Sequence, residues 1–302
     1  MALGVCMRVL VIAAVLIGLA GPAAARDATI ATPPAAQPAP VPAERMALAR
    51  EVMAAGGGTA AFQGMVDKLT LPAKDEAADT TAAMAPSRAD MRKKMMVVMP
   101  DIIDAVTLIY ARTFSDAELR AMLDYARSPI GQSVHAKRMR VLELMTPETM
   151  WALAAIGTED GDKPTEPPPL PSPQPSAKSL ALAARYVAVS GTAERVADTP
   201  FALGRVMTTI TALMPPGSGL EPTATDDAAT LRMKARAKAL IPEFARRAAW
   251  IYAGVYSDEE LQGQIDYLLT PAGQAQLRLK PVVEAEVQKA IVSIIQRMMA
   301  GG

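Results

Sequence analysis

The sequence predicts an all-α fold with two tandem homologous helical-bundle domains joined by a Pro-rich linker. Hydrophobic residues make up 51% of the chain but aromatic residues only 4%, so the apolar content is mostly Ala, Leu, Val and Met, which favours closely packed helices. No segment shows the alternating pattern of a strand. The block from Ile109 to Gln132 returns from Ile251 to Gln274 at a constant offset of 142 positions, as between Tyr110 and Tyr252. A repeat of this length indicates duplication of a whole small domain.

The first 25 residues have the layout of a secretory signal peptide. Arg8 precedes an apolar run at 9–20, and three alanines ending at Ala25 provide a cleavage site. The apolar run is shorter than the roughly 20 residues that span a bilayer. We therefore expect residues 1–25 to be removed, no transmembrane segment to remain, and the mature protein to be periplasmic or secreted. Cys6, the only cysteine, would be removed with the signal peptide, so the mature protein would have no disulfide.

Two Pro-rich stretches set the predicted domain boundaries. Residues 26–43 are rich in Pro and Ala without apolar periodicity, and we expect them to be disordered. Residues 157–176 form the linker, because their run of prolines can neither continue a helix nor bury a core. The first helical copy is therefore predicted at 44–156 and the second at 177–302.

Each copy is predicted to contain the same helices in the same order. The first helix of each copy ends at a glycine, Gly56 or Gly191. Pro100 and Pro242 lie at matching positions in the long third helices and are expected to bend them. In the first copy the predicted helices are 44–55, 60–69, 88–113, 116–126 and 129–156, with a polar loop at 72–86. In the second copy they are 179–190, 193–213, 226–255, 258–268 and 271–300, with a loop at 215–225.

The repeated block is interpreted as a structural motif. A Ser followed three residues later by Glu predicts a capping box, in which each side chain accepts a hydrogen bond from the other residue's amide. An aromatic residue before the Ser and a Leu after the Glu form a hydrophobic staple across this helix start. The residues are Phe114, Ser115, Glu118 and Leu119 in the first copy and Tyr256, Ser257, Glu260 and Leu261 in the second.

The same block predicts a second helix start in each copy. Pro129 and Pro271 stand at the first helical position, each after a hydroxyl residue that can cap the helix. Gly131 and Gly273 follow at the third position and are expected to let another helix approach closely. The tyrosines of the block are expected to bury their rings and to donate to backbone carbonyls or carboxylates. These are Tyr110, Tyr125, Tyr252, Tyr256 and Tyr267.

The chemical alternatives to this structural interpretation are weaker. Glu118 and Asp124 could form an acid/base pair, but six helical residues place them about 240° apart. Asp124 and Asp266 could meet only if the two domains pack face to face. His135 is the only histidine, and Leu277 occupies its place in the second copy. A Met stripe at 91, 95 and 99 could bind Cu(I), although this spacing is typical of a core face. No catalytic, cofactor-binding or metal-binding residue is assigned.

The repeated pattern resembles the domain of unknown function 2059 family. The pattern is Tyr-Ala, an aromatic residue and Ser, Glu-Leu, Tyr, and then Ser/Thr-Pro-x-Gly-Gln, and it runs from Tyr110 to Gln132 and from Tyr252 to Gln274. This family occurs in exported proteins of Gram-negative bacteria. The resemblance implies an all-helical periplasmic domain in two tandem copies, and it implies no catalytic residue.

The expected function is non-enzymatic binding of a protein, an envelope component or a second copy of the chain. The formal net charge is zero and its signs are interspersed, which argues against binding to nucleic acid. The alternative is a small-ligand-binding or hydrolase-like helical protein with a pocket between the two domains. The sequence leaves open whether the chain has any enzymatic activity, and it indicates no cofactor.

Overall fold

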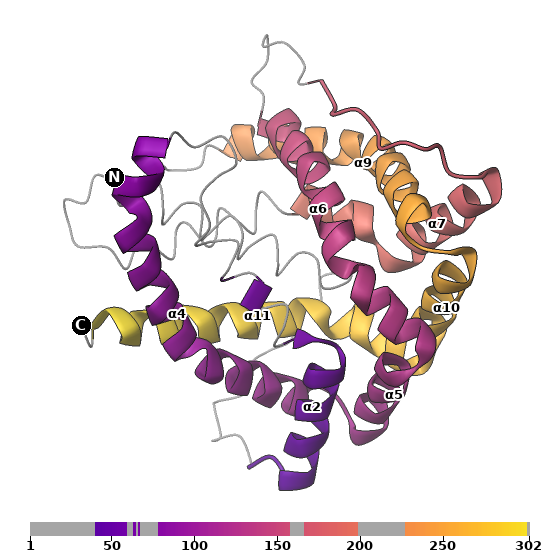
Figure 1. Cartoon of the computed structure of the whole chain (residues 1–302). Coiled ribbons are helices and arrows are strands. Elements are labelled where there is room, and N and C mark those ends of the chain that lie inside the picture. Colours follow the sequence, from indigo (N-terminus) through magenta and orange to yellow (C-terminus); the bar gives the residue numbers. More distant parts are fainter. Residues whose placement is uncertain are drawn as a thin grey trace. The chain divides into compact units, whose positions relative to one another are not determined.

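The computed structural model is all-helical, as predicted (Figure 1). It describes residues 40–58, 63, 64, 66, 78–157, 166–198 and 227–300, and no strand occurs in these ranges. The helices are α2 (Ala43–Ala55), α4 (Ala78–Thr113), α5 (Asp116–Arg127), α6 (Pro129–Gly157), α7 (Ala177–Ser190), α9 (Asp227–Val255), α10 (Asp258–Leu269) and α11 (Pro271–Ala300). A further helical segment covers residues 192–198.

Some predictions fall outside the described residues. They are the signal peptide, the Pro/Ala-rich segment up to residue 39, most of the helix predicted at 60–69, and the helix predicted at 193–213 beyond residue 198. The loop predicted at 72–86 is wrong from residue 78 onward, because α4 begins at Ala78. The sequence there is rich in Ala, the strongest helix former, and this outweighs the polar residues that suggested a loop.

The helices divide into two compact units. The first, here called the N-terminal unit, contains α2, α4, α5 and the part of α11 from Pro281 onward. The second, the central unit, contains α6, α7, α9, α10 and α11 up to Lys280. This division does not follow the boundary predicted at residues 157–176, because α6 of the first copy packs with helices of the second copy.

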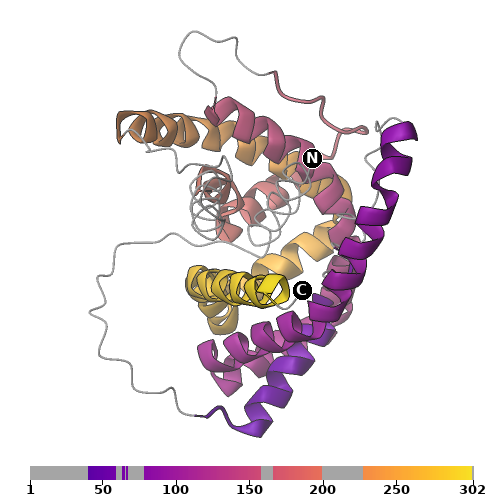
Figure 2. The same ribbon diagram turned by 90° about the vertical axis from the view of Figure 1, so that its left-hand side faces the viewer.

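The core of the central unit forms where α6 and α7 pack along α9, and α10 contacts both α6 and α7 (Figures 1 and 2). These helices bury apolar side chains against one another, which is the main source of their stability. From α6 come Val141, Met145, Trp151 and Ala152, from α7 Ala183 and Val187, from α9 Phe244, Ala248, Ile251 and Tyr252, and from α10 Leu261.

One part of the core of the N-terminal unit lies between α4 and the second half of α11, and α2 packs on α4 and α5 in another part. Val98, Ile102 and Val106 of α4 pack with Ile294 of α11. Met53 of α2, Tyr110 of α4, and Val287 and Ile291 of α11 are partly buried against this cluster. Two ion pairs join α2 to α5, one between Arg45 and Asp116 at 2.5 Å and one between Arg127 and Glu51 at 2.8 Å.

Local signals explain where α7 begins and ends. Ser176 is the N-cap, and its side chain accepts a hydrogen bond from the Ser179 amide. Gly191 ends the helix in the left-handed conformation at φ 60°, which glycine adopts without a Cβ clash. Pro100 and Pro242 do not end their helices, since α4 and α9 continue through them.

None of the helices in the described part of the chain is both long and apolar enough to cross a membrane.

Candidate functional site

Both copies of the repeated motif contain the reciprocal hydrogen bonds of a capping box. In the second copy the Glu260 amide donates to Ser257 Oγ at 3.2 Å, and the Ser257 amide donates to Glu260 Oε2 at 2.7 Å. In the first copy the corresponding distances between Ser115 and Glu118 are 3.3 Å and 2.7 Å. The staple residues Phe114, Leu119, Tyr256 and Leu261 are all buried.

Glu260 also binds side chains of a neighbouring helix. Its carboxylate also accepts hydrogen bonds from Ser133 and from Lys137, whose Nζ lies 2.6 Å from Oε2, and both residues are on α6. Burial raises the pKa of Glu260, but the bonds from Lys137, Ser133 and the Ser257 amide outweigh it and hold this pKa below its usual value. The carboxylate therefore caps α10 and fixes it to α6.

This lowered pKa predicts a pH dependence of stability. The contribution of Glu260 is complete above the usual glutamate pKa, about 4.3, and is lost as the pH falls through the lower pKa of the folded state. Chemical denaturation between pH 6 and pH 3 should therefore show a smaller loss of stability for Glu260→Gln than for the wild type. Glu259→Gln, which removes the neighbouring exposed carboxylate, is the control. Equal losses in all three proteins would contradict the prediction.

The cap itself predicts a moderate stability effect. Ser257→Ala should lower the free energy of unfolding by about 1 kcal/mol, the usual size of a lost N-cap, whereas Ser257→Asp should largely retain it because Asp also caps well. Thermal unfolding of the two variants side by side measures this. If Ser257→Ala left the melting temperature unchanged and removed an interaction of the protein, the structural interpretation of the motif would be wrong.

The second helix start is capped in the same way in each copy. Ser128 Oγ accepts from the Gly131 amide at 3.0 Å, and Thr270 Oγ1 accepts from the Gly273 amide at 3.1 Å. Both glycines are buried. At Gly273 the expected close approach is present, and it is made by the backbone of the last turn of α10.

The tyrosine rings of the repeated block pack against other aromatic rings, and two of their hydroxyl groups bond to polar side chains. The Tyr252 ring meets Tyr186 edge-on at 5.0 Å and stacks with Tyr256 at 6.1 Å, while Tyr110 lies 5.3 Å from Phe114. Tyr267 donates to the side-chain oxygen of Gln276 at 2.8 Å, and Tyr252 bonds to Thr192. Burial raises the pKa of Tyr125 to about 12.

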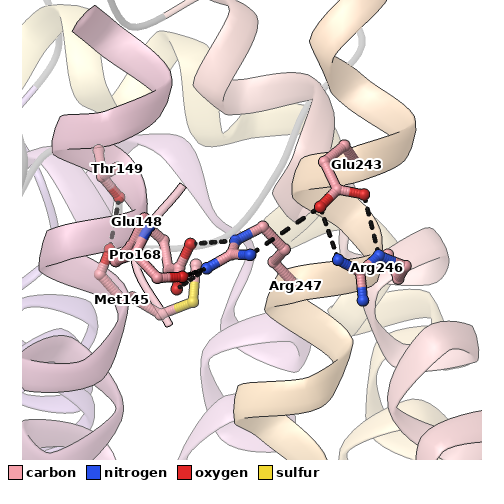
Figure 3. Close-up of polar contacts among 7 residues, drawn as sticks. All are labelled: Met145, Glu148, Thr149, Pro168, Glu243, Arg246 and Arg247. Carbon is pink, nitrogen blue, oxygen red and sulfur yellow. Dashed lines mark hydrogen bonds and ion pairs between the residues drawn. The ribbon is translucent and has the colours of Figure 1, made fainter. Parts of the chain in front are cut away.

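A buried ion pair joins α6 to α9 in the central unit (Figure 3). Arg247 Nε lies 2.5 Å from Glu148 Oε2 and Arg247 Nη2 lies 2.8 Å from Oε1, a bidentate arrangement. The two side chains are only 4% and 3% exposed. The guanidinium also lies 5.3 Å from the centre of the Trp151 ring, within cation–π range.

The described part of the predicted linker is bound by two side chains of α9. Arg247 Nη2 donates to the carbonyl of Pro168, and Trp250 Nε1 donates to the carbonyl of Pro171 at 2.9 Å. An extended Pro-rich chain has no internal hydrogen bonds, so its carbonyls are free to accept such donors. We call residues 166–175 the proline strap. Beside it a hollow of about 430 Å³ is lined by Pro171, Pro173, Lys137, Arg140 and Trp250, among others.

Sequence reasoning missed Glu148, Arg247 and the strap contacts. A signal for the ion pair was present, because Glu148 continues the apolar stripe of Met145 and Ala152, and Arg247 lies beside Phe244 and Ala248. Opposite charges at core positions of two helices indicate a buried pair. Nothing in the sequence identified which carbonyls of the strap would be bound.

The other candidate groups have ordinary surroundings. Asp266 accepts from Gln262 at 2.7 Å on its own helix. Partial burial and the charge of Arg138 lower the pKa of His135. In the Met stripe, Met99 is buried and Met95 is half-buried. Within the described ranges, no three His, Cys, Asp or Glu residues are grouped closely enough to hold a metal ion.

An apolar depression lies between α7 and α9. We call it the α7–α9 trough, and its volume is about 520 Å³. Its walls consist mainly of small and aliphatic side chains, and Ala184 and Ala188 in them are exposed. Charged side chains of opposite sign, Glu194 and Arg246, also line it. The lining residues are Leu180, Ala184, Val187, Ala188, Ala193, Glu194, Ile241, Ala245, Arg246, Ala249 and Trp250.

Comparison with known families supports part of the resemblance. Residues 100–159 match the model of a family described as "Uncharacterized protein conserved in bacteria (DUF2059)". The match covers the repeated block of the first copy, from the middle of α4 to the end of α6. Neither a curated protein nor a solved structure matches the chain.

Proposed function

We propose that the chain is an exported, non-enzymatic bacterial protein with two copies of this domain, which acts by binding another protein. The family match supports the bacterial origin and the first copy. The repeat at an offset of 142 positions supports the second copy, since it preserves the capping box, the staple and the Ser/Thr-Pro-x-Gly-Gln helix start.

The α7–α9 trough is the observation that carries the binding proposal. Exposed apolar surface with polar residues at its edge is typical of protein interaction sites. The small side chains of Ala184 and Ala188 leave room for the backbone of an approaching helix. An amphipathic helix placed in an apolar groove is a recurrent recognition mode, and Glu194 at the wall of the trough provides a charge for the polar edge of such a helix, whereas Arg246 is already paired with Glu243. We therefore propose an amphipathic helix of a protein partner as the occupant.

Site-specific photo-crosslinking in cells tests this proposal. A photoreactive side chain at position 184, inside the trough, should give an adduct of defined mass, and one at position 181, exposed on the same helix but outside the trough, should not. Ala188→Glu should suppress the adduct, because it places a charge in the apolar groove. Identical adducts at both positions, or an adduct unaffected by Ala188→Glu, would contradict the proposal.

A small apolar ligand is the second candidate for the same trough. Its volume lies within the range of roughly 300–1,000 Å³ that small-molecule sites occupy. Native mass spectrometry of the protein isolated from cells separates the two candidates. An added mass of a few hundred daltons that is absent from Ala188→Glu and present in Ala181→Glu would favour the ligand.

Export is tested independently of binding. The layout of residues 1–25 supports cleavage after Ala25. Mass spectrometry of the protein from a periplasmic fraction should therefore identify Arg26 as the first residue. Intact chains retained in the membrane fraction would contradict export with cleavage and leave the binding proposal standing.

A further inference from the structure

The two cores use equivalent positions of the repeat. Ile102, Val106 and Tyr110 of α4 belong to the core of the N-terminal unit. The residues 142 positions later are Phe244, Ala248 and Tyr252 of α9, and all three belong to the core of the central unit. The third helix of each copy therefore presents the same face to its core.

The helices that cover these faces come from the opposite copies. Met145 and Ala152, on the last helix of the first copy, pack with α9 of the second copy. Their equivalents 142 positions later are Val287 and Ile294, on the last helix of the second copy, and they pack with α4 of the first copy. The two contacts thus use equivalent positions reciprocally, although α6 packs far more extensively on α9 than α11 does on α4.

We infer that the two copies have exchanged their last helices. The apolar face of each last helix is an interaction surface, and its occupant is the other copy of the repeat in the same chain. Each unit thus contains a helix from the other copy, as in dimers that swap an element, here within one polypeptide. Neither 44–156 nor 177–302 alone contains a complete core, so the two copies form an interlocked pair rather than two autonomous domains.

The charges of Glu148 and Arg247 favour this exchange over an arrangement in which each last helix packs on its own copy. The position equivalent to Arg247 is Ala105, which is packed against the core of the N-terminal unit. If α6 packed on its own copy, Glu148 would meet Ala105 and Arg247 would meet Ala290, the equivalent of Glu148. Glu148 would then be buried without a partner, and Arg247 would lose its bidentate carboxylate and keep only the more distant one of Glu243 on its own helix, at 3.9 Å. Such a loss is unfavourable for buried charges. The exchange pairs them with each other.

A disulfide in the full chain tests the exchange directly. A Cβ atom built at Gly263 of α10 lies 3.6 Å from Cβ of Ile130 on α6, within the spacing of a disulfide, about 3.5–4.5 Å. Ile130→Cys/Gly263→Cys is made in a chain with Cys6→Ser and a protease site within residues 158–165. After oxidation and cleavage, a non-reducing gel should show one band at the mass of the uncut chain, and reduction should give two fragments.

A mismatched pair and the chain without added cysteines complete the test. Thr149→Cys/Gly263→Cys is the control, because Thr149 lies 19 residues further along α6, roughly 28 Å away from Ile130. Without added cysteines, the cleaved protein should elute as one species on size exclusion. Fragments that elute separately, or the absence of a disulfide in the Ile130/Gly263 pair, would overturn the inference. A disulfide-linked dimer of the uncut chain would show that the helices are exchanged between two chains. This result would contradict the inference of an exchange within one chain.

Discussion

Replacing Glu148 by Ala is expected to lower the free energy of unfolding of the central unit by about 3–5 kcal/mol, the usual cost of removing one partner of a buried ion pair. The loss is large because Arg247 would keep its charge while its side chain is only 4% exposed. Its remaining contacts are the Pro168 carbonyl, the Trp151 ring and the Glu243 carboxylate at 3.9 Å, and none of them replaces a carboxylate that accepts two hydrogen bonds. Denaturant unfolding followed by Trp fluorescence measures the effect.

Glu143→Ala is the matched control on the same helix. Glu143 also pairs with an arginine, Arg140 at 2.8 Å, but both side chains are more than half exposed. Exposed pairs contribute roughly 0–1 kcal/mol, so this variant should unfold close to the wild type. If Glu148→Ala were no more destabilising than Glu143→Ala, the pair would not be desolvated as the structure shows.

Replacing both partners shows how much of the destabilisation comes from leaving one charge buried without its partner and how much from losing the ion pair itself. Glu148→Leu/Arg247→Met fills a similar volume without charge, and such replacements are often neutral or stabilising by about 1–4 kcal/mol. We expect the double variant to be much more stable than Glu148→Ala. It would also remove the charge pairing that favours helix exchange, so after cleavage in the linker its fragments should separate more readily than those of the wild type.

The sequence predicted the local parts of this structure well, because local signals determine them. Helix starts at Ser257 and Thr270 follow from the capping residues themselves, and α7 ends at Gly191 as its glycine indicates. The apolar stripes likewise identified which faces of the helices are buried. These inferences need only residues within a few positions of one another.

The sequence could not predict which copy each last helix would cover. The apolar stripe of α6 does not by itself select between α4 and α9, because both helices present apolar residues at equivalent positions of the repeat. What distinguishes them is the pairing of Glu148 with Arg247, which are 99 positions apart. The contacts of the proline strap could not be predicted either. Its carbonyls accept hydrogen bonds from Arg247 and Trp250, which are distant in the sequence and meet the strap only in the folded structure. For this reason a stretch with the composition of a linker lies against a core.

Gly273→Ala is expected to destabilise the protein by about 1–3 kcal/mol or more, the range for forcing extra volume into a packed site. A Cβ atom at this position would lie 2.6 Å from Cα and 2.9 Å from the carbonyl carbon of Leu268, and closer still to the carbonyl oxygen of Tyr267. All three atoms are backbone at the end of α10, so they cannot move aside as a flexible side chain would. The junction between α10 and α11 would have to open, which would also strain the Thr270 cap.

Gly254→Ala is the control, and it should stabilise the protein rather than destabilise it. Gly254 lies near the end of α9, and a Cβ atom there would meet nothing within 4 Å. Alanine should therefore stabilise this helix by roughly 0.5–1 kcal/mol, because glycine loses more conformational freedom on folding. Thermal and denaturant unfolding of the two variants should thus move in opposite directions from the wild type. If Gly273→Ala unfolded at or above the wild-type midpoint, the tight approach of α10 to α11 would be wrong, and the Gly in Ser/Thr-Pro-x-Gly-Gln would need an explanation other than packing.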